Sequence, residues 1–187
     1  MLNRLKISAL ALLVTTCSLP AVEHLLEVRV AAFVPTGGLF REIYGSVGAD
    51  YELEYTLRWS RTWAAWANLA WYPKHGHSIG LESPTRVNLG NLSVGVRVLY
   101  DFNQKVSGYL GLGPSLTGVW VNNQACCSCD RVSKTTVGGV AKLGCYVYLY
   151  KSLYADLFVD YLYQPIHFES TVNVGGLKAG LGLGVRL

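Results

Sequence analysis

Apolar and polar positions alternate along the last stretch of the chain, residues 177–187. The odd positions carry only leucine, alanine and valine, whereas the even positions carry Lys178, three glycines and Arg186. Successive side chains of a β-strand point to opposite faces. The pattern therefore predicts a strand with one apolar face and one face made of glycine and cations.

The same alternation recurs in seven further segments, which span residues 24–34, 51–59, 63–72, 89–100, 106–120, 137–150 and 153–164. No helical periodicity competes with it after residue 21. Pro114 lies inside the fifth of these segments. Since proline cannot donate a ladder hydrogen bond, we expect a local bulge or bend there.

The connections between the segments also alternate in length. Those at 60–62, 101–105 and 150–152 are tight, whereas those at 35–50, 73–88, 121–136 and 164–174 are long and polar. Short turns at one end and long loops at the other are typical of an up-and-down barrel. The sequence therefore predicts an all-β fold, an eight-stranded antiparallel up-and-down transmembrane β-barrel.

Residues 1–21 have the features of a secretory signal peptide. Arg4 and Lys6 precede a short apolar stretch at 7–14, and small residues follow. We predict cleavage after Ala21, with lipidation of Cys17 as the alternative. The barrel domain is then residues 22–187.

Alternation alone does not say which face of the barrel is the outside, and a soluble lipocalin-like barrel would have the same period. Only 15% of the residues are charged, whereas a soluble domain carries about 25%. Glycines on an exposed face would weaken the strands, but in a narrow lumen they make room for large rings. We therefore expect the apolar face to contact lipid.

Large aromatic residues lie near the strand ends of the apolar face. Amphipathic rings at both edges of an apolar band form the girdle of a membrane protein. The predicted girdle comprises Tyr51, Trp59, Trp63, Trp71, Tyr100, Trp120 and Tyr161.

The opposite face carries acids and bases in nearly equal number. Buried charges need partners, which a closed lumen can supply. We predict a structural network of ion pairs that joins Glu27, Glu52, Glu54, Asp156 and Asp160 to Arg29, Arg58, Arg97, Lys142, Lys178 and Arg186. Because eight strands leave room only for side chains, the lumen is expected to be plugged. A narrow conduit for small hydrophobic ligands stays open as an alternative.

The chain resembles the small outer-membrane barrel superfamily that includes OmpX, the transmembrane domain of OmpA and the opacity-type proteins. The resemblance rests on the signal peptide, the eight strands, "YLGLGPSLTGVWV" at 109–121 and the glycine-alternating last strand. It departs at Leu187, where such chains usually end on Phe or Trp. The resemblance implies an integral protein of the bacterial outer membrane with both termini in the periplasm. It also implies contact with outer-membrane lipid and lipopolysaccharide.

The loop at 121–136 holds the densest group of reactive side chains, Cys126, Cys127 and Cys129. In an oxidising compartment we expect a disulfide among them, with one thiol left for an intermolecular bond. Their spacing matches no zinc pattern, so no metal site is predicted. Cys145 is expected to be a small apolar residue on the lipid face.

Some barrels of this size modify lipid A, and the resemblance implies a His and a Ser for that activity, with a carboxylate in the deacylases. The candidates are His167, Glu169 and Ser170 in one loop and His75, His77 and Ser78 in another. Neither segment has the His-x-Ser spacing of the deacylases, so no catalytic residue is predicted. A deacylase-like hydrolase stays open as an alternative.

The predicted function is therefore non-enzymatic, without a cofactor. A monomeric barrel presents four extracellular loops, in surface adhesion or envelope integrity, to a host-cell or matrix ligand. Nucleic acid is not an expected partner, because the basic residues are few and scattered.

Overall fold

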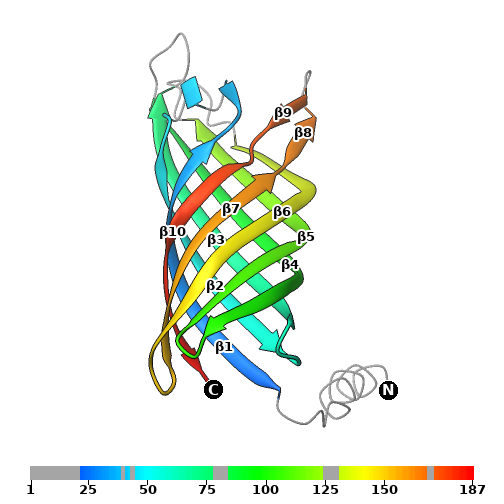
Figure 1. The fold of residues 1–187 in the computed structure, drawn as a ribbon. Coiled ribbons are helices and arrows are strands. Elements are labelled where there is room, and N and C mark those ends of the chain that lie inside the picture. Colours follow the sequence, from blue (N-terminus) through cyan, green and yellow to red (C-terminus); the bar gives the residue numbers. More distant parts are fainter. Residues whose placement is uncertain (1–21, 39–40, 43–44, 78–83, 124–130, 168–170) are drawn as a thin grey trace, which may run out of the picture.

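The computed structural model describes residues 22–38, 41–42, 45–77, 84–123, 131–167 and 171–187. Residues 1–21, which include the predicted signal peptide, lie outside the described residues. Eight strands form a closed barrel (Figure 1): β1 (Glu23–Pro35), β2 (Gly48–Arg58), β3 (Trp63–His77), β4 (Pro84–Asn103), β5 (Val106–Asn123), β6 (Arg131–Tyr150), β7 (Leu153–Tyr163) and β10 (Gly176–Arg186).

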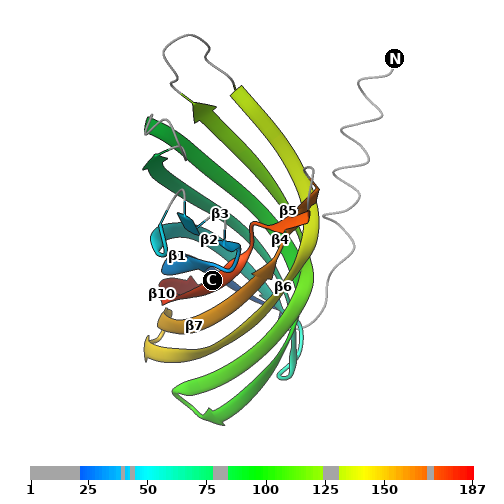
Figure 2. The ribbon, with the colours of Figure 1, turned by 90° about the horizontal axis from the view of Figure 1, so that it is seen from above.

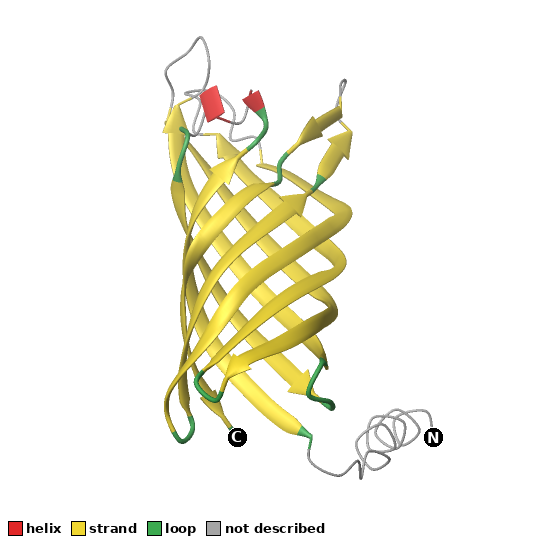
Figure 3. Ribbon diagram, viewed as in Figure 1, coloured by secondary structure: helices red, strands yellow, loops and turns green. Residues whose placement is uncertain are grey.

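Each strand pairs with the next in an antiparallel ladder, and β10 closes the barrel against β1. The strands cross the barrel at a steep tilt and, seen from above, curve around a common interior (Figure 2). Almost the whole described chain is strand (Figure 3). The predicted all-β, eight-stranded antiparallel barrel is confirmed.

Three short turns lie at one end of the barrel, and the C-terminus lies at that same end (Figure 1). The pairing of Leu25 with Arg186 places the start of β1 beside the end of β10. The longer connections lie at the opposite end. We call these two ends the turn end and the loop end.

Two of the predicted long loops are shorter than expected. The β3–β4 ladder continues to the pair His77–Pro84, and the β5–β6 ladder continues to Asn122–Arg131. The predictions of polar loops across 73–88 and 121–136 are therefore wrong for most of their length. In these outer parts of β3 to β6 the backbones still pair, but the sequence no longer alternates between apolar and polar residues, which is the pattern that marks the rest of the strands.

The connection at 164–174 also contains strand. Its two short strands, β8 (Pro165–His167) and β9 (Thr171–Asn173), pair with each other beside the loop end. Gln164 in front of β8 is buried, and its amide donates a hydrogen bond to the hydroxyl of Ser115 on β5. The base of this hairpin is thus tied to the barrel wall.

Pro114 interrupts the β4–β5 ladder without changing its register. The pairs Ser93–Ser115 and Val96–Leu112 belong to one register, and the positions between them are unpaired. The missing N–H of proline therefore opens a gap in the ladder rather than a β-bulge. The register shifts of the barrel lie near the turns instead, between Asp101 and Asn103 and between Tyr148 and Tyr150.

The apolar face of each of the eight barrel strands points outward, as predicted, and the lipocalin-like alternative is wrong. Each strand exposes an aliphatic side chain by 47% or more of its surface: Val28, Leu53, Leu69, Leu92, Leu112, Leu143, Leu157 and Leu181. Among the residues described, no helix is long and apolar enough to cross a membrane.

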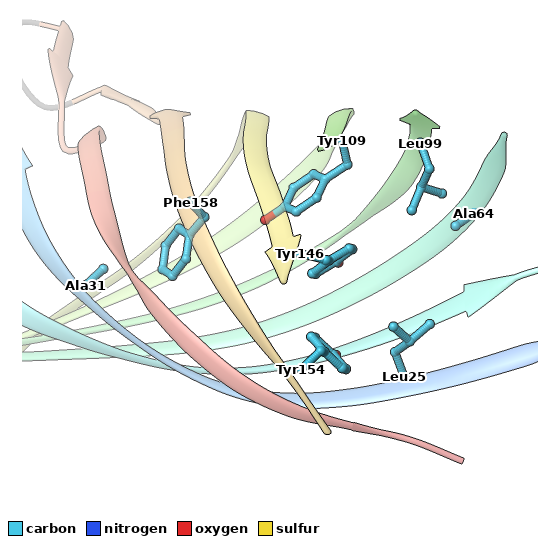
Figure 4. Packing of buried hydrophobic residues seen from close by; sticks show 8 residues of the cluster. All are labelled: Leu25, Ala31, Ala64, Leu99, Tyr109, Tyr146, Tyr154 and Phe158. Carbon is cyan, nitrogen blue, oxygen red and sulfur yellow. The ribbon is translucent and has the colours of Figure 1, made fainter. Parts of the chain in front are cut away.

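The interior near the turn end is filled by aromatic rings that glycines accommodate. Tyr109, Tyr146 and Tyr154 point inward from β5, β6 and β7 (Figure 4), with ring centroids 4.7 and 5.1 Å apart. A Cβ added at Gly144 would meet the ring of Tyr109, and one at Gly184 would meet Tyr154. Neighbouring strands thus alternate large and small residues, which fills a narrow lumen.

We predict that Gly144→Ala destabilises the barrel, because the added methyl group overlaps the Tyr109 ring. Overpacking of this kind costs about 1–3 kcal/mol. Gly139→Ala on the same strand is the matched control, since its Cβ would meet only the carbonyl oxygen of Gly113, at 3.7 Å. It should change the free energy of unfolding by less than about 0.5 kcal/mol. Urea unfolding of the refolded protein in detergent measures both, and equal effects would contradict this account of the glycines.

Candidate functional site in the barrel interior

The centre of the barrel is a cluster of buried ion pairs around Arg29 on β1. Its guanidinium lies within 4 Å of five carboxylates and is fully buried. The closest is Glu54 at 2.6 Å, and the others, at 3.3–3.6 Å, are Glu27, Glu52, Asp156 and Asp160.

Glu54 on β2 is the second centre of the cluster. Besides Arg29 it contacts Arg97 of β4 and, at 2.8 Å, Lys142 of β6. Asn68 of β3 donates a hydrogen bond of 3.3 Å to the same carboxylate. One acidic side chain is thereby connected to four other strands, so the cluster ties opposite sides of the barrel wall together.

A row of alternating charge follows the register of the neighbouring strands. Lys178 on β10 is paired with Asp160 on β7, and Asp160 with Lys142 on β6. Lys142 Nζ lies 2.9 Å from Asp160 Oδ2. Opposite charges on directly facing positions of a sheet attract each other, so the register itself favours this row.

Lys178 also contacts two carboxylates of β2. Its ammonium group lies 2.9 Å from Glu52 Oε1 and also contacts Asp50. Asp50 is absent from the predicted network, because the predicted strand begins at residue 51. Extending the alternation by one inward position past Glu52 would have found it.

Aromatic rings cover the cations where no carboxylate does. Arg29 Cζ lies 3.4 Å from the ring centroid of Phe158, and Arg97 Cζ lies 4.5 Å from that of Tyr109. Lys142 Nζ lies 4.8 Å from the Trp66 ring. Such contacts stabilise desolvated cations. The ion pairs and the rings together fill the middle of the lumen.

Two predicted members of the network, Arg58 and Arg186, lie apart from it at the turn end. Arg58 pairs with Asp101 at 2.9 Å, and Arg186 pairs with Glu23 at 2.7 Å. Half of the Arg186 side chain is exposed. The two arginines line an open cavity of about 910 Å³ at this end of the barrel, together with Glu23 and Asp101.

The interior changes from charged to apolar toward the loop end. A cluster of buried apolar side chains lies there: Phe33, Tyr72, Val87, Leu89, Val119, Ile166 and Val174. Between it and the charged cluster is a cavity of about 20 Å³, next to Asp50 and Lys178. That volume is close to the size of a single water molecule.

All seven residues of the predicted girdle are exposed, by 41–68%, and six of them lie on the outward face of a strand. The seventh, Trp59, directly follows β2 and also lines the cavity at the turn end. Trp59, Trp63 and Tyr100 lie toward the turn end, whereas Tyr51, Trp71, Trp120 and Tyr161 lie nearer the loop end. The prediction missed Phe102, which packs edge-on against Tyr100 with 5.1 Å between ring centroids, and Tyr150. Phe102 continues the outward-facing even positions of β4 beyond the predicted end of that strand. Tyr150 directly follows the register shift in β6, which changes the alternation there.

The histidine, serine and cysteine candidates lie toward the loop end or outside the described residues. His75 lies exposed on β3, and the backbones of His77 and His167 belong to β3 and β8. Ser78, Glu169, Ser170 and the cysteines Cys126, Cys127 and Cys129 lie outside the described residues. In the part of the chain that is described, Cys145 is a free thiol, and no three His, Cys, Asp or Glu side chains are arranged to hold a metal ion.

Comparison with known proteins identifies the fold. Ail of Yersinia pestis, in complex with the heparin analogue sucrose octasulfate, is similar with a TM-score of 0.61 and 15% identity over 89% of this chain and 99% of its own. Neisserial surface protein A is similar with a TM-score of 0.61 and 18% identity, over 88% and 96% of the two chains. The outer membrane protein OprG of Pseudomonas aeruginosa has a TM-score of 0.65 and 13% identity, over 89% and 96%.

No protein-family model and no curated protein sequence matches the chain. The structural similarity confirms the predicted resemblance at the level of the fold, which is that of the small eight-stranded outer-membrane barrels.

We predict that Arg29→Met strongly destabilises the barrel, because five carboxylates lose a buried cation. Removing one partner from a buried ion pair costs about 3–5 kcal/mol. Arg186→Met is the matched control, since its single pair at the turn end is half exposed and such pairs contribute at most about 1 kcal/mol. Urea unfolding in lipid vesicles compares the two variants. A similar decrease in the free energy of unfolding for both variants would show that the central cluster stabilises the barrel no more than the exposed pair does.

Proposed function

We propose that the protein is an integral barrel of the bacterial outer membrane without enzymatic activity, which presents its loop end at the cell surface in adhesion or envelope integrity. The observation that carries the proposal is the exposed aliphatic belt, to which all eight strands contribute, around an interior of ion-paired charges. An apolar belt of this extent is costly in water and favourable in a bilayer.

The two ends of the barrel support an orientation. Short turns on the periplasmic side and longer extracellular connections are the rule in barrels of this architecture. The turn end carries the C-terminus (Figure 1). We therefore place the turn end in the periplasm and the loop end outside. The seven predicted aromatic residues and Phe102 then lie at the two interfaces with lipid and lipopolysaccharide, as amphipathic rings prefer.

The closed interior favours a filled barrel that supports the loops over a barrel that conducts small hydrophobic ligands. At the level of Arg29, Glu54 and Arg97 the side chains are at most 1% exposed. A ligand of any size would have to break several buried ion pairs to pass. The charges are therefore better explained as a rigid filling that holds the barrel than as the lining of a path.

The same ion pairs favour a structural over a catalytic role for the buried polar groups. In a deacylase-like enzyme a nucleophile and its base must reach the substrate. The polar groups of the central cluster are instead enclosed within the barrel and engaged with one another.

Two of the similar structures suggest a role at the cell surface. Ail is described as an attachment invasion locus protein and binds a heparin analogue in its crystal, and another similar barrel is described as a surface protein. On such a scaffold function lies in the loops. We therefore propose a host-cell or matrix ligand at the loop end as the partner of this protein.

Membrane fractionation of cells that express the full chain tests the first part of the proposal. We expect recovery in the outer-membrane fraction and a shift in gel migration when the sample is boiled in SDS, because the closed barrel resists SDS until it is heated. Recovery in the soluble periplasmic fraction without such a shift would contradict the proposal.

Exchange of the loop segments tests the second part. Replacement of residues 78–83 and 124–130 by Gly-Ser linkers of equal length should abolish binding of the expressing bacteria to epithelial cells or to immobilised heparin. The matched control is the same exchange of residues 104–105 at the turn end, which should leave binding intact. If both exchanged proteins bind as the parent does, adhesion through these loops is rejected. Detergent sensitivity of the cells then tests envelope integrity.

A further inference from the structure

The buried interior contains more acids than bases. Within the described residues, the buried acids are Glu27, Asp50, Glu52, Glu54, Asp156 and Asp160, and the buried bases are Arg29, Arg97, Lys142 and Lys178. The predicted network is nearly neutral, because it includes Arg58 and Arg186, which lie at the turn end, and omits Asp50. With every group ionised, the interior would carry an excess of two negative charges.

An excess of this kind is costly in a closed barrel. The cluster has little contact with water, since each of these ten residues is at most 5% exposed. Unpaired ionised carboxylates in such a medium cost several kcal/mol each, and a buried group that lacks a partner becomes neutral instead. The excess must therefore be removed by protons or by a bound cation.

The contacts identify the carboxyl groups that are least compensated. Glu54 contacts three cations, and Glu52 and Asp160 contact two each. The three remaining acids, Glu27, Asp50 and Asp156, contact one cation each.

Glu27 and Asp156 compete for the same donor. Glu27 Oε1 lies 3.6 Å and Asp156 Oδ2 lies 3.5 Å from Arg29 Nε, which carries a single hydrogen. Both oxygens of Glu27 and Oδ1 of Asp156 have no hydrogen-bond partner, although both residues are buried. Tyr109 donates a hydrogen bond of 2.8 Å to Asp156 Oδ2, which leaves Glu27 as the least satisfied acid of the interior.

Asp50 is in a similar position at the other side of the cluster. Asp50 shares the ammonium group of Lys178 with Glu52. Glu52 also forms an ion pair with Arg29 and accepts a hydrogen bond from Asn68. Oδ2 of Asp50 makes the contact with the Lys178 ammonium group, and among the described residues no second cation lies within 4 Å of this carboxylate. Of these two acids, Asp50 is therefore the one with less compensation.

We infer that the folded barrel binds two protons in its interior at neutral pH, one at the Glu27–Asp156 pair and one at Asp50. The charged and titratable groups around the Glu27–Asp156 pair are Arg29, Glu54, Arg97, Tyr109, Tyr146 and Tyr154. Those that face Asp50 are Glu52, Tyr72 and Lys178. The inference concerns the interior alone and does not depend on the role of the loops.

Proton binding makes the stability of the barrel depend on pH in a defined direction. Exposed carboxyl groups of the unfolded chain ionise near pH 4, so at neutral pH the folded state binds more protons than the unfolded state. Stability must then fall as the pH rises above about 4, and the fall ends at the pH where the folded barrel releases the interior protons. Each proton changes the unfolding equilibrium constant by up to tenfold per pH unit, and two protons change it by up to a hundredfold.

Two measurements on the unaltered full chain test the inference. Refolding from urea into detergent in weakly buffered solution at pH 7 should take up about two protons per chain, read with a pH indicator. Infrared spectra of the folded protein in D₂O should show the C=O band of protonated carboxyl groups. Absence of both signals would overturn the inference.

Variants then assign the sites. Glu27→Gln and Asp50→Asn should each remove about one proton from the uptake and weaken the infrared band, and each should flatten the fall in stability between about pH 4 and neutral pH. Glu42→Gln, at an exposed position of the loop end, is the control and should change none of these readings. If the control lowers uptake as much as the interior variants do, the inference fails.

A bound cation is the competing explanation, and it gives a different result. In that case the infrared band is absent, the uptake is near zero, and stability changes with the concentration of Na⁺, K⁺ or Ca²⁺ at constant pH. This outcome would overturn the assignment of protons and replace it with an ion site.

Discussion

Closure of β1 against β10 is the constraint on which the rest of this structure depends. In a lipid environment no strand edge can be left unpaired, because hydrocarbon offers its N–H and C=O groups no partner. Eight strands satisfy this condition with a narrow barrel. The narrow barrel in turn decides what the inward side chains can be: glycines opposite large rings, and charges close enough to pair.

The inward charges are more than a consequence of closure. A polar inner face keeps the alternation strict, since a slip of one residue would turn every charge outward and bury every leucine. Glu54 and Arg29 contact partners on several strands, so they also define which strands face each other across the lumen. In this way the cluster specifies the register, although a buried ion pair does not by itself guarantee net stability.

The alternation of the sequence predicts on which face of a strand each residue lies, but not at which height along the barrel axis. It correctly predicts that Arg58 and Arg186 share a face with Arg29. It cannot show that the first two lie at the turn end, because depth follows from strand tilt and register, which relate distant segments. For the same reason the acid Glu23 and the far ends of β3 to β6 were missed: at the barrel ends neither the apolar face nor the charge pattern persists. The low content of charged residues, the glycines and the aromatic residues at the strand ends predict that the apolar face points outward, which the alternation alone leaves open.

The two ends of the barrel interior differ in polarity and in openness. At the turn end the lumen opens into a cavity of about 910 Å³ with charged walls, whereas toward the loop end an apolar layer that includes Phe33, Tyr72 and Ile166 covers the charged cluster. Ile166 belongs to β8, so the connection at the loop end is itself part of the closure. A polar path through the barrel would need a polar interior that continues through that layer. Because the polar interior stops beneath it, the loop end is joined to a filled stem, which agrees with the proposal that ligands are bound at the loop end and not inside the barrel.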